Sequence, residues 1–231
     1  MAPKVLVVLT SFGHITEAAK PTGWYLPELS HPYDVLTAAG VEIVTASPKG
    51  GLAPLDPASV ELFKDDAGAQ AFYREKKAVW EQTAPLSTFR GRAGEFAALF
   101  YPGGHGPMFD LVSDADSIAV IEEFAAAGKV VSAVCHGPVV LVNAKRADGT
   151  PLLAGRDVTG FSNAEEDAMD MSKFMPFLLE DKIREVGGHY KKAEQPWGEL
   201  VLVQDDGRLI TGQNPASAKG IGEAILKAIG A

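Results

Sequence analysis

This chain has very little cysteine: one residue, Cys135, among 231. A single cysteine excludes an internal disulfide and every cysteine-rich zinc site, and it indicates a reducing compartment, so we expect a cytoplasmic protein. The chain also lacks an excess of positive charge, because 21 Lys and Arg stand against 30 Asp and Glu, a net charge of −9. This balance, with no basic run, argues against a nucleic-acid partner.

Long apolar runs are scarce as well. The N-terminal segment holds one apolar run, residues 5–9, that is too short for the core of a signal peptide. No stretch approaches the roughly 20 apolar residues of a membrane span, so we expect no membrane partner. With 46% apolar residues the chain can form a continuous core without disulfide or metal. No repeat or linker divides it, and we expect a single domain over residues 1–231.

Four short apolar runs are typical of strands buried on both faces, as in a parallel sheet. They cover residues 4–9, 41–46, 96–102 and 129–134. Helical patterns lie between them, most clearly at 113–129. The alternation of strand and helix predicts a doubly wound α/β sandwich with a mostly parallel central sheet.

The ends of several elements can be predicted from capping and turn residues. The helix at 113–129 takes Ser113 or Asp114 as its cap and ends at Gly128. The segment "ELVLVQDDGRLITG" (199–212) predicts a β-hairpin about an Asp-Gly turn. A closing helix follows, with Asn214 as its cap and a proline at its first position.

Two segments are longer than a simple crossover requires. Residues 64–95 are charged and helical in pattern, and we interpret them as a helical insertion. Residues 163–188 form a second, amphipathic stretch, whose Met and Phe residues are more often core than a cofactor site.

Cys135 follows the predicted strand 129–134 at once, in the stretch "VVSAVCHGPVVL". A nucleophile on a strand-to-helix turn needs small residues two positions before and after it, because the backbone is tight there. Ala133 and Gly137 meet that requirement. Such a turn lies at the carboxyl edge of the sheet, where the helix N-terminus favours a thiolate. The pattern predicts a nucleophile of lowered pKa, although a strand-end cysteine taken alone is more often part of the core.

A glycine-rich turn, "YPGGHGPMFD" (101–110), follows another predicted strand. If the two strands are neighbours, the backbone N–H of Gly104 faces Cys135 and forms a two-donor oxyanion hole with the N–H of His136. The turn does not match the dinucleotide or P-loop spacing, and an ordinary strand-to-helix turn is the alternative.

Five motifs carry a family resemblance: "AVCHGP" (133–138), "PGGHG" (102–106), "TGFSNAEE" (159–166), "PW" (196–197) and "LITGQNPASA" (209–218). Together they resemble the ThiJ/PfpI superfamily, and within it the branch of the 31-kilodalton heat-shock chaperones and the glutathione-independent glyoxalases, called glyoxalase III. The resemblance extends from Lys4 to about Ile229. It implies a flavodoxin-like sandwich of the class I glutamine amidotransferase type, which agrees with the strand and helix pattern.

The resemblance also implies site residues. The family's catalytic cysteine falls on Cys135 and its adjacent histidine on His136. A glutamate of the first loop-helix, in "GWYLPELSHPYDVL", falls on Glu28. The carboxylate that orients the histidine falls on Glu166, with Glu165 one position away as the alternative.

Each of these assignments has a structural alternative. Glu28 could be an exposed carboxylate in the first turn of a helix, and the acidic residues 165–167 could be a cluster favoured by the helix dipole. We interpret His14, His31 and His105 as loop or packing residues. The spacing contains no self-contained metal motif, and the resemblance implies no cofactor.

The resemblance implies a glyoxalase III that converts methylglyoxal and water to lactate through a cysteine hemithioacetal. Cys135 would be the nucleophile, Glu28 would relay a proton, and His136, oriented by Glu166, would shuttle another. The substrate would be a small 2-oxoaldehyde, and family members are commonly homodimers.

Two other enzyme classes share the cysteine turn. A glutamine amidotransferase takes its histidine from far downstream, with a glutamate two residues beyond it. Here the downstream histidine is His189, and Lys191 occupies the position of that glutamate. A protease or amidase needs room for a peptide, which a glutamate beside the sulfur would restrict. We disfavour both.

The family also includes stress-induced holdases and protein deglycases, which act on unfolded or glycated proteins. Four apolar residues, Phe174, Met175, Phe177 and Leu178, could bind unfolded chains, although such residues are more often core or a dimer interface. A redox-sensor role is compatible with each of these functions, because an exposed thiolate oxidises readily.

Overall fold

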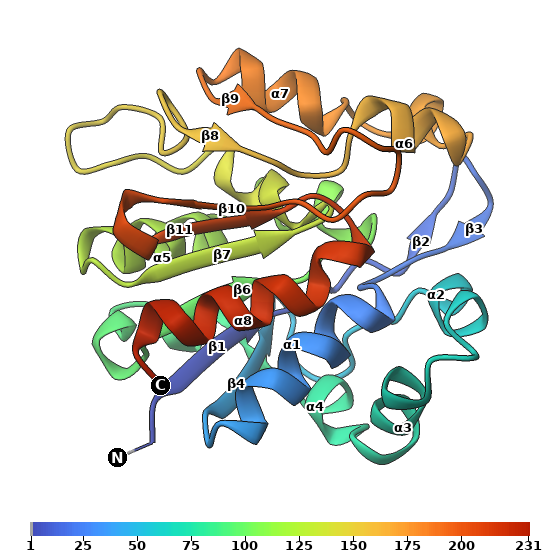
Figure 1. The fold of residues 1–231 in the computed structure, drawn as a ribbon, viewed down its shortest axis with the longest axis horizontal. Coiled ribbons are helices and arrows are strands. Elements are labelled where there is room, and N and C mark those ends of the chain that lie inside the picture. The colour runs from blue at the N-terminus through green and yellow to red at the C-terminus, as the bar shows by residue number, and fades with distance from the viewer. Residues whose placement is uncertain (1) are drawn as a thin grey trace.

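A seven-stranded sheet forms the centre of the structure, a computed structural model that describes residues 2–231. Its strands are β1 (Lys4–Val8), β4 (Glu42–Ser47), β5 (Ala84–Pro85), β6 (Ala98–Tyr101), β7 (Val130–Val134), β10 (Val201–Gln204) and β11 (Leu209–Gly212). Their order is β10-β11-β7-β6-β1-β4-β5 (Figure 1). All neighbours pair in parallel except β10 and β11, which form the predicted antiparallel hairpin at the edge. The α/β class is therefore confirmed.

Helices cover both faces of this sheet. The long helices α1 (Leu26–Ala38) and α8 (Ala218–Ile229) pack against each other on one face, and α5 (Ala115–Ala126) covers the other (Figure 1). The shorter helices are α2 (Pro57–Leu62), α3 (Ala67–Glu75), α4 (Ala78–Glu81), α6 (Asn163–Ala168) and α7 (Leu179–Glu185). Two small pairs, β2 (His14–Ile15) with β3 (Lys20–Pro21) and β8 (Asp157–Val158) with β9 (His189–Tyr190), lie outside the main sheet.

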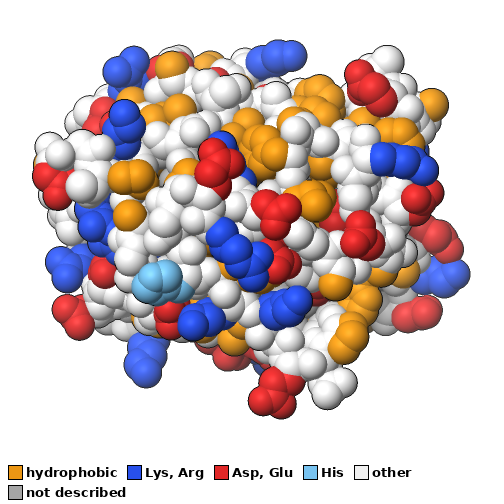
Figure 2. Space-filling model, turned by 90° about the horizontal axis from the view of Figure 1, so that it is seen from above, with side chains coloured by type: hydrophobic (Ala, Val, Ile, Leu, Met, Phe, Trp, Pro, Cys, Tyr) orange, Lys and Arg blue, Asp and Glu red, His pale blue; other side chains and the backbone are white. Residues whose placement is uncertain are grey.

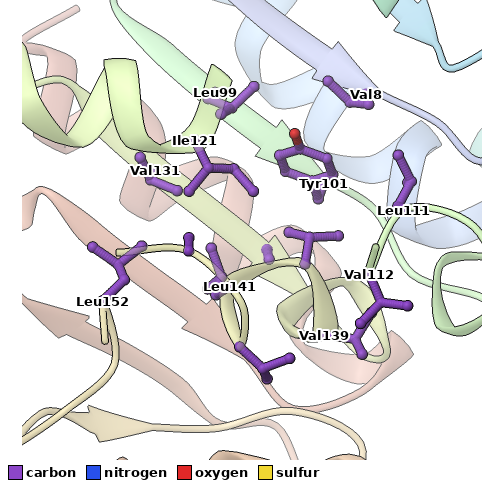
Figure 3. Close-up of a cluster of buried hydrophobic side chains, with 14 of the residues drawn as sticks. Val8, Leu99, Tyr101, Leu111, Val112, Ile121, Val131, Val139, Leu141 and Leu152 are labelled. Carbon is purple, nitrogen blue, oxygen red and sulfur yellow. The ribbon is translucent and has the colours of Figure 1, made fainter. Parts of the chain in front are cut away.

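The predicted strands are buried on both faces, as their continuous apolar runs require. In β1, Leu6 and Val8 face the core under α5, whereas Val5 and Val7 face the core under α1 and α8. Figure 3 shows part of the first core, where Tyr101 lies among the aliphatic side chains of the strands and of α5. Two apolar cores, one on each side of the sheet, hold the strand ends in fixed positions.

The helix ends test the capping predictions. Asp114 caps α5, because its carboxylate accepts a 2.7 Å hydrogen bond from the N–H of Ser117, and Gly128 follows the helix with a φ of 66°. The prediction that Asn214 caps the closing helix is wrong. Its side chain makes no capping bond, and α8 begins at Ala218, after a 3₁₀ turn over Pro215–Ser217. The amide of Asn214 instead bonds to Glu165 and to the carbonyl of Gly198.

The segment 64–95 contains helices α3 and α4, and then adds the two-residue strand β5 to the sheet edge. Two 3₁₀ turns, η1 (Leu86–Phe89) and η2 (Ala93–Glu95), complete it. The sequence pattern does not indicate β5, because two residues are too few for a period of two to be visible.

Charges of both signs are interspersed on the face of the molecule in Figure 2, with apolar side chains between them. Across residues 2–231, every helix is too short or too polar to cross a membrane.

Candidate functional site

Cys135 lies directly after β7, at a sharply strained point of the backbone. Its φ is 62°, a value that non-glycine residues rarely adopt. The conformation is fixed from both sides, because its N–H donates to the carbonyl of Gly212 at 3.0 Å and its carbonyl accepts from Phe161 at 2.8 Å. At Gly137 any Cβ would lie 2.3 Å from the carbonyl oxygen of Tyr101, which explains the need for glycine. The predicted strand-to-helix turn is confirmed.

The cysteine lies at the base of a small pocket with a volume of about 30 Å³. The pocket is lined by Tyr25, Glu28, Gly104, His105, Cys135, His136, Phe161, Met169, Trp197 and Pro215. The structure thus brings together four predicted residues from α1, the turn after β6, and the turn after β7. Glu166, from α6, lies behind His136 and reaches the site through it.

Glu28 is completely buried in the first turn of α1. Its Oε2 accepts a 2.8 Å hydrogen bond from the N–H of Gly103, and a Cβ at Gly103 would lie 2.8 Å from that oxygen. Oε1 has no conventional hydrogen-bond partner among residues 2–231. Burial raises the pKa of Glu28 to about 8, although contacts with Cys135 and the Gly103 amide partly oppose the rise. Glu28 is therefore a buried, protonated acid at neutral pH, and the alternative of an exposed carboxylate is wrong.

Cys135 has a raised pKa, so the prediction of a lowered one is wrong. Burial is the largest cause, and the negative charge of an ionised Glu28 adds to it. A hydrogen bond from the backbone of Gly104 acts in the opposite direction but is weaker. The sequence pattern indicated the strand-end turn but not the degree of burial, because Cys135 is only 3% exposed. At neutral pH the resting site holds a thiol beside a neutral carboxylic acid.

The glycine-rich turn after β6 lies beside Cys135, as an oxyanion hole formed with the Gly104 amide requires. Strands β6 and β7 are neighbours, with Tyr101 opposite Ala133, and the Gly104 amide reaches the sulfur of Cys135. Gly104 has a φ of 84°, and a Cβ there would lie 2.2 Å from the carbonyl oxygen of Gly23. Only glycine fits this position. The oxyanion role of the Gly104 and His136 amides stays a prediction.

His136 connects the cysteine to a carboxylate. Its Nδ1 lies 3.6 Å from Sγ of Cys135, and its Nε2 lies 2.6 Å from Oε2 of Glu166. Burial lowers the pKa of His136, with the attraction of Glu166 as a partial compensation. Burial would raise the pKa of Glu166, but the two histidines that it contacts hold that pKa far below its usual range. A neutral His136 that donates from Nε2 to an ionised Glu166 therefore presents a free lone pair on Nδ1 toward the sulfur.

His105 is a site residue that the sequence reasoning missed. Its Nε2 lies 2.7 Å from the other carboxylate oxygen, Oε1 of Glu166, and its ring is tilted by 42° from that of His136, with 4.3 Å between centroids. The interpretation of His105 as a loop or packing residue is therefore wrong. Its place in a glycine turn after the strand next to that of Cys135 was the available signal.

The adjacent glutamates of α6 have different partners. Glu165 forms a capping box with Ser162, and its Oε1 accepts hydrogen bonds from Gln213 and Asn214 at 3.1 and 2.8 Å. Glu166 faces the two histidines instead, because one residue turns a helix by about 100°. The geometry thus favours Glu166 over Glu165 as the partner of His136.

The two histidines and Glu166 also form a group that could hold a metal ion. One donor atom from each lies within 4.8 Å of the others, and all three residues are buried. Two imidazoles and a carboxylate suit zinc or iron. An ion bound there would compete with the hydrogen bonds that orient His136.

The outer rim of the pocket is apolar. The ring of Phe161 lies 4.4 Å from that of His136 and 5.6 Å from that of Trp197. Trp197 is 43% exposed and has a φ of 60°, and Met169 beside the pocket is 39% exposed. These side chains make the entrance of the pocket largely apolar.

Other sequence predictions fall outside the pocket. His189 is exposed in β9, where it pairs with Asp157, so it is not the histidine of an amidotransferase site. His31 bonds to Asp66 at 2.7 Å, and His14 is exposed in β2.

The four apolar residues at 174–178 do not form a free patch. Met175 is buried in the core, and Phe174 and Phe177 pack against that core. Leu178 is partly buried at the start of α7.

Comparisons with known proteins agree with this geometry. The model of the DJ-1/PfpI family, another name for the ThiJ/PfpI group, matches residues 23–228. The glutathione-independent glyoxalase HSP31 of Saccharomyces cerevisiae is 30% identical over 94% of each chain. The crystal structure of glyoxalase III from Candida albicans is 29% identical, with a TM-score of 0.83 over 98% of this chain and 97% of that one. The Francisella tularensis rapid encystment protein is 32% identical, with a TM-score of 0.90 over 98% and 99%.

Proposed function

Because this chain belongs to the DJ-1/PfpI family, we propose that it is a glutathione-independent glyoxalase that converts methylglyoxal and water to lactate. The observation that carries the proposal is a thiol, a protonated carboxylic acid and a neutral histidine around one pocket of about 30 Å³. A pocket this small favours a 2-oxoaldehyde of a few heavy atoms over a peptide.

The first step adds sulfur to the aldehyde carbon. A free thiolate is costly in this buried site, so the addition proceeds with proton transfer. Oε1 of Glu28, which carries the acid proton, donates it to the carbonyl oxygen. The thiol proton passes to the carboxyl group of Glu28, and Cys135 forms a neutral hemithioacetal. No net charge develops, and the amides of Gly104 and His136 hold the oxygen during the transfer.

The second step moves a proton between adjacent carbons. Nδ1 of His136 removes the proton from the former aldehyde carbon, the hydroxyl group on that carbon passes its proton to the neighbouring ketone oxygen, and the anion of an enediol forms. The imidazolium that results is stabilised by Glu166, which lies 2.6 Å away. His136 then returns the proton to the neighbouring carbon, which yields a thioester of lactate on Cys135. Water hydrolyses this thioester, releases lactate and restores the thiol, so one water is consumed and no oxidant is needed.

The test measures lactate from methylglyoxal without glutathione and with a metal chelator present. We expect turnover by the wild type and its loss in Cys135→Ser, with circular dichroism as the control for folding. In D₂O the lactate should carry deuterium at C2, because the proton on His136 exchanges with solvent. Full activity in Cys135→Ser would overturn the nucleophile, and complete retention of the substrate hydrogen at C2 would overturn the enediol.

We also propose, from the family resemblance alone, a homodimer in the cytoplasm. Sedimentation velocity of the 24.4 kDa chain tests the assembly. A species of about twice this mass supports the dimer, and a monomer at micromolar concentration contradicts it. Fractionation of cells tests the location.

A further inference from the structure

A second cavity, of about 360 Å³, lies at the other end of the sheet from Cys135. We name it the distal cavity. Val131 in β7 and Leu209 at the start of β11 contribute to its wall. Val131 and Cys135 are four residues apart along an extended strand, a separation of about 13 Å. The distal cavity is therefore separate from the glyoxalase pocket.

The distal cavity gathers positive charge on a chain that is negative overall. Its charged lining consists of Lys129, Lys145, Arg146, Arg156 and Arg208, with Glu122 and Asp205 as the acidic members. Five cations against two carboxylates give a local excess of three positive charges, whereas the whole chain carries −9. Like charges repel, and a bound anion would relieve the repulsion between these side chains.

Internal ion pairs neutralise only part of this excess. Within residues 2–231, Lys129, Lys145 and Arg146 have no carboxylate within salt-bridge distance. Arg156 pairs with Asp205, and Arg208 pairs with an exposed acid outside the cavity.

Two guanidinium groups of the cavity are held in place by bonds to the protein. The Nε atoms of Arg146 and Arg156 are buried and have no hydrogen-bond partner among the described residues. Other nitrogens of both side chains bond to the carbonyl of Leu152, which fixes the orientation of the two groups. Guanidinium groups held in this way keep their positive charge at the cavity wall, and that charge suits a phosphate or carboxylate.

The rest of the lining is apolar and comes from Ala125, Ala126, Ala147, Leu152, Val131 and Leu209. An apolar wall beside convergent cationic donors is typical of a site for a small organic anion, and 360 Å³ lies in the usual range for such sites. We propose that the distal cavity binds a phosphate monoester with a compact apolar body, the phosphate on the Lys and Arg side chains and the body against the wall. This function is independent of the glyoxalase reaction.

Isothermal titration calorimetry tests the proposal with phenyl phosphate, inorganic phosphate and phenol as probes. We expect saturable binding of phenyl phosphate at low salt, at least ten-fold weaker binding of inorganic phosphate, and no binding of phenol. Raising the salt to about 0.3 M should weaken phenyl phosphate binding, because its charge is part of the recognition. Equal affinity for phenyl phosphate and inorganic phosphate would overturn the apolar part of the proposal, and no saturable heat would overturn all of it.

Variants then locate the site. Lys129→Gln with Lys145→Gln should reduce the affinity for phenyl phosphate at least ten-fold. The matched control, Lys64→Gln with Lys219→Gln, removes the same charge from exposed positions outside the cavity and should bind like the wild type. Cys135→Ser should also bind normally, which separates this site from the proposed glyoxalase. Equal losses of affinity for phenyl phosphate in the two double variants would contradict binding in the distal cavity.

Discussion

Glu28 beside Cys135 and Glu166 behind His136 are both buried, yet their pKa values shift in opposite directions. Glu28 meets only one backbone N–H and a thiol, which offset little of the cost of burying its charge, and its pKa rises to about 8. Glu166 meets two imidazoles and stays ionised. Similar burial therefore produces an acid on one side and an anion on the other, and the hydrogen-bond partners decide which.

The largest effect on activity is expected from Glu166→Gln. An amide cannot stabilise an imidazolium or fix its tautomer, so activity should fall by about 10³–10⁴-fold. The matched control is Glu165→Gln, one residue earlier, which should keep activity within about ten-fold. It should instead lower the free energy of unfolding by about 1–3 kcal/mol, because it disturbs a buried capping network. Steady-state kinetics measure the activity of the two variants, and urea unfolding measures their stability. A larger loss of activity in Glu165→Gln than in Glu166→Gln would show that Glu165 is the partner of His136.

Glu28→Gln should reduce activity by about 10²–10³-fold, because the amide is neutral but cannot relay a proton. The pH dependence of activity tests the role of the Glu28 proton more directly. In the wild type, activity should fall above about pH 8 as Glu28 ionises, since the reaction needs its protonated form. The residual activity of Glu28→Gln should lack this alkaline decline. A profile with the same alkaline limb in both proteins would show that another group causes it.

Glu28 also links stability to pH. Folding raises its pKa from 4.5 to about 8, so the folded state holds this proton more tightly than the unfolded chain does. The stabilisation is full below pH 4.5 and is lost as the pH rises to about 8. Between pH 6 and 8.5 the wild type should lose about 3 kcal/mol relative to Glu28→Gln. Urea unfolding at the two pH values measures this, and parallel changes in the two proteins would contradict the raised pKa.

His105→Asn should have the smallest effect, a loss of activity of about ten-fold. His105 lowers the pKa of His136 by its charge and shares the carboxylate of Glu166 with it. Its removal should raise the pKa of His136, so the acid limb of the pH profile should move toward neutral pH. A loss of activity with an unmoved acid limb would indicate a packing role alone.

Much of the fold could be predicted from periodicity. The strands at 4–9 and 129–134 are apolar throughout because both faces of the sheet are covered, and the helix after Asp114 carries its own cap. The strand β5 and the role of Asn214 could not be predicted, because each depends on a partner distant in sequence. Asn214 is a residue type that often caps helices, but here its Nδ2 group donates to Glu165 and to the carbonyl of Gly198, and its Oδ1 makes no capping bond.

The candidate site shows the same division. Cys135 stands out from local sequence alone, since a tight turn restricts its neighbours to small residues. His105 does not stand out from local sequence, because its place in the site depends on its bond to Glu166, 61 positions away in the chain.

The sequence by itself determined the order of strands and helices, the strained cysteine turn and the candidate residues around it, since propensity, burial pattern and turn sterics act between near neighbours. The tertiary structure alone decided which of two adjacent glutamates meets His136, that Cys135 and Glu28 keep their protons, and that five cations surround the distal cavity. Those outcomes depend on solvent exclusion and on charges brought together by folding, and both act through space between residues far apart in the chain.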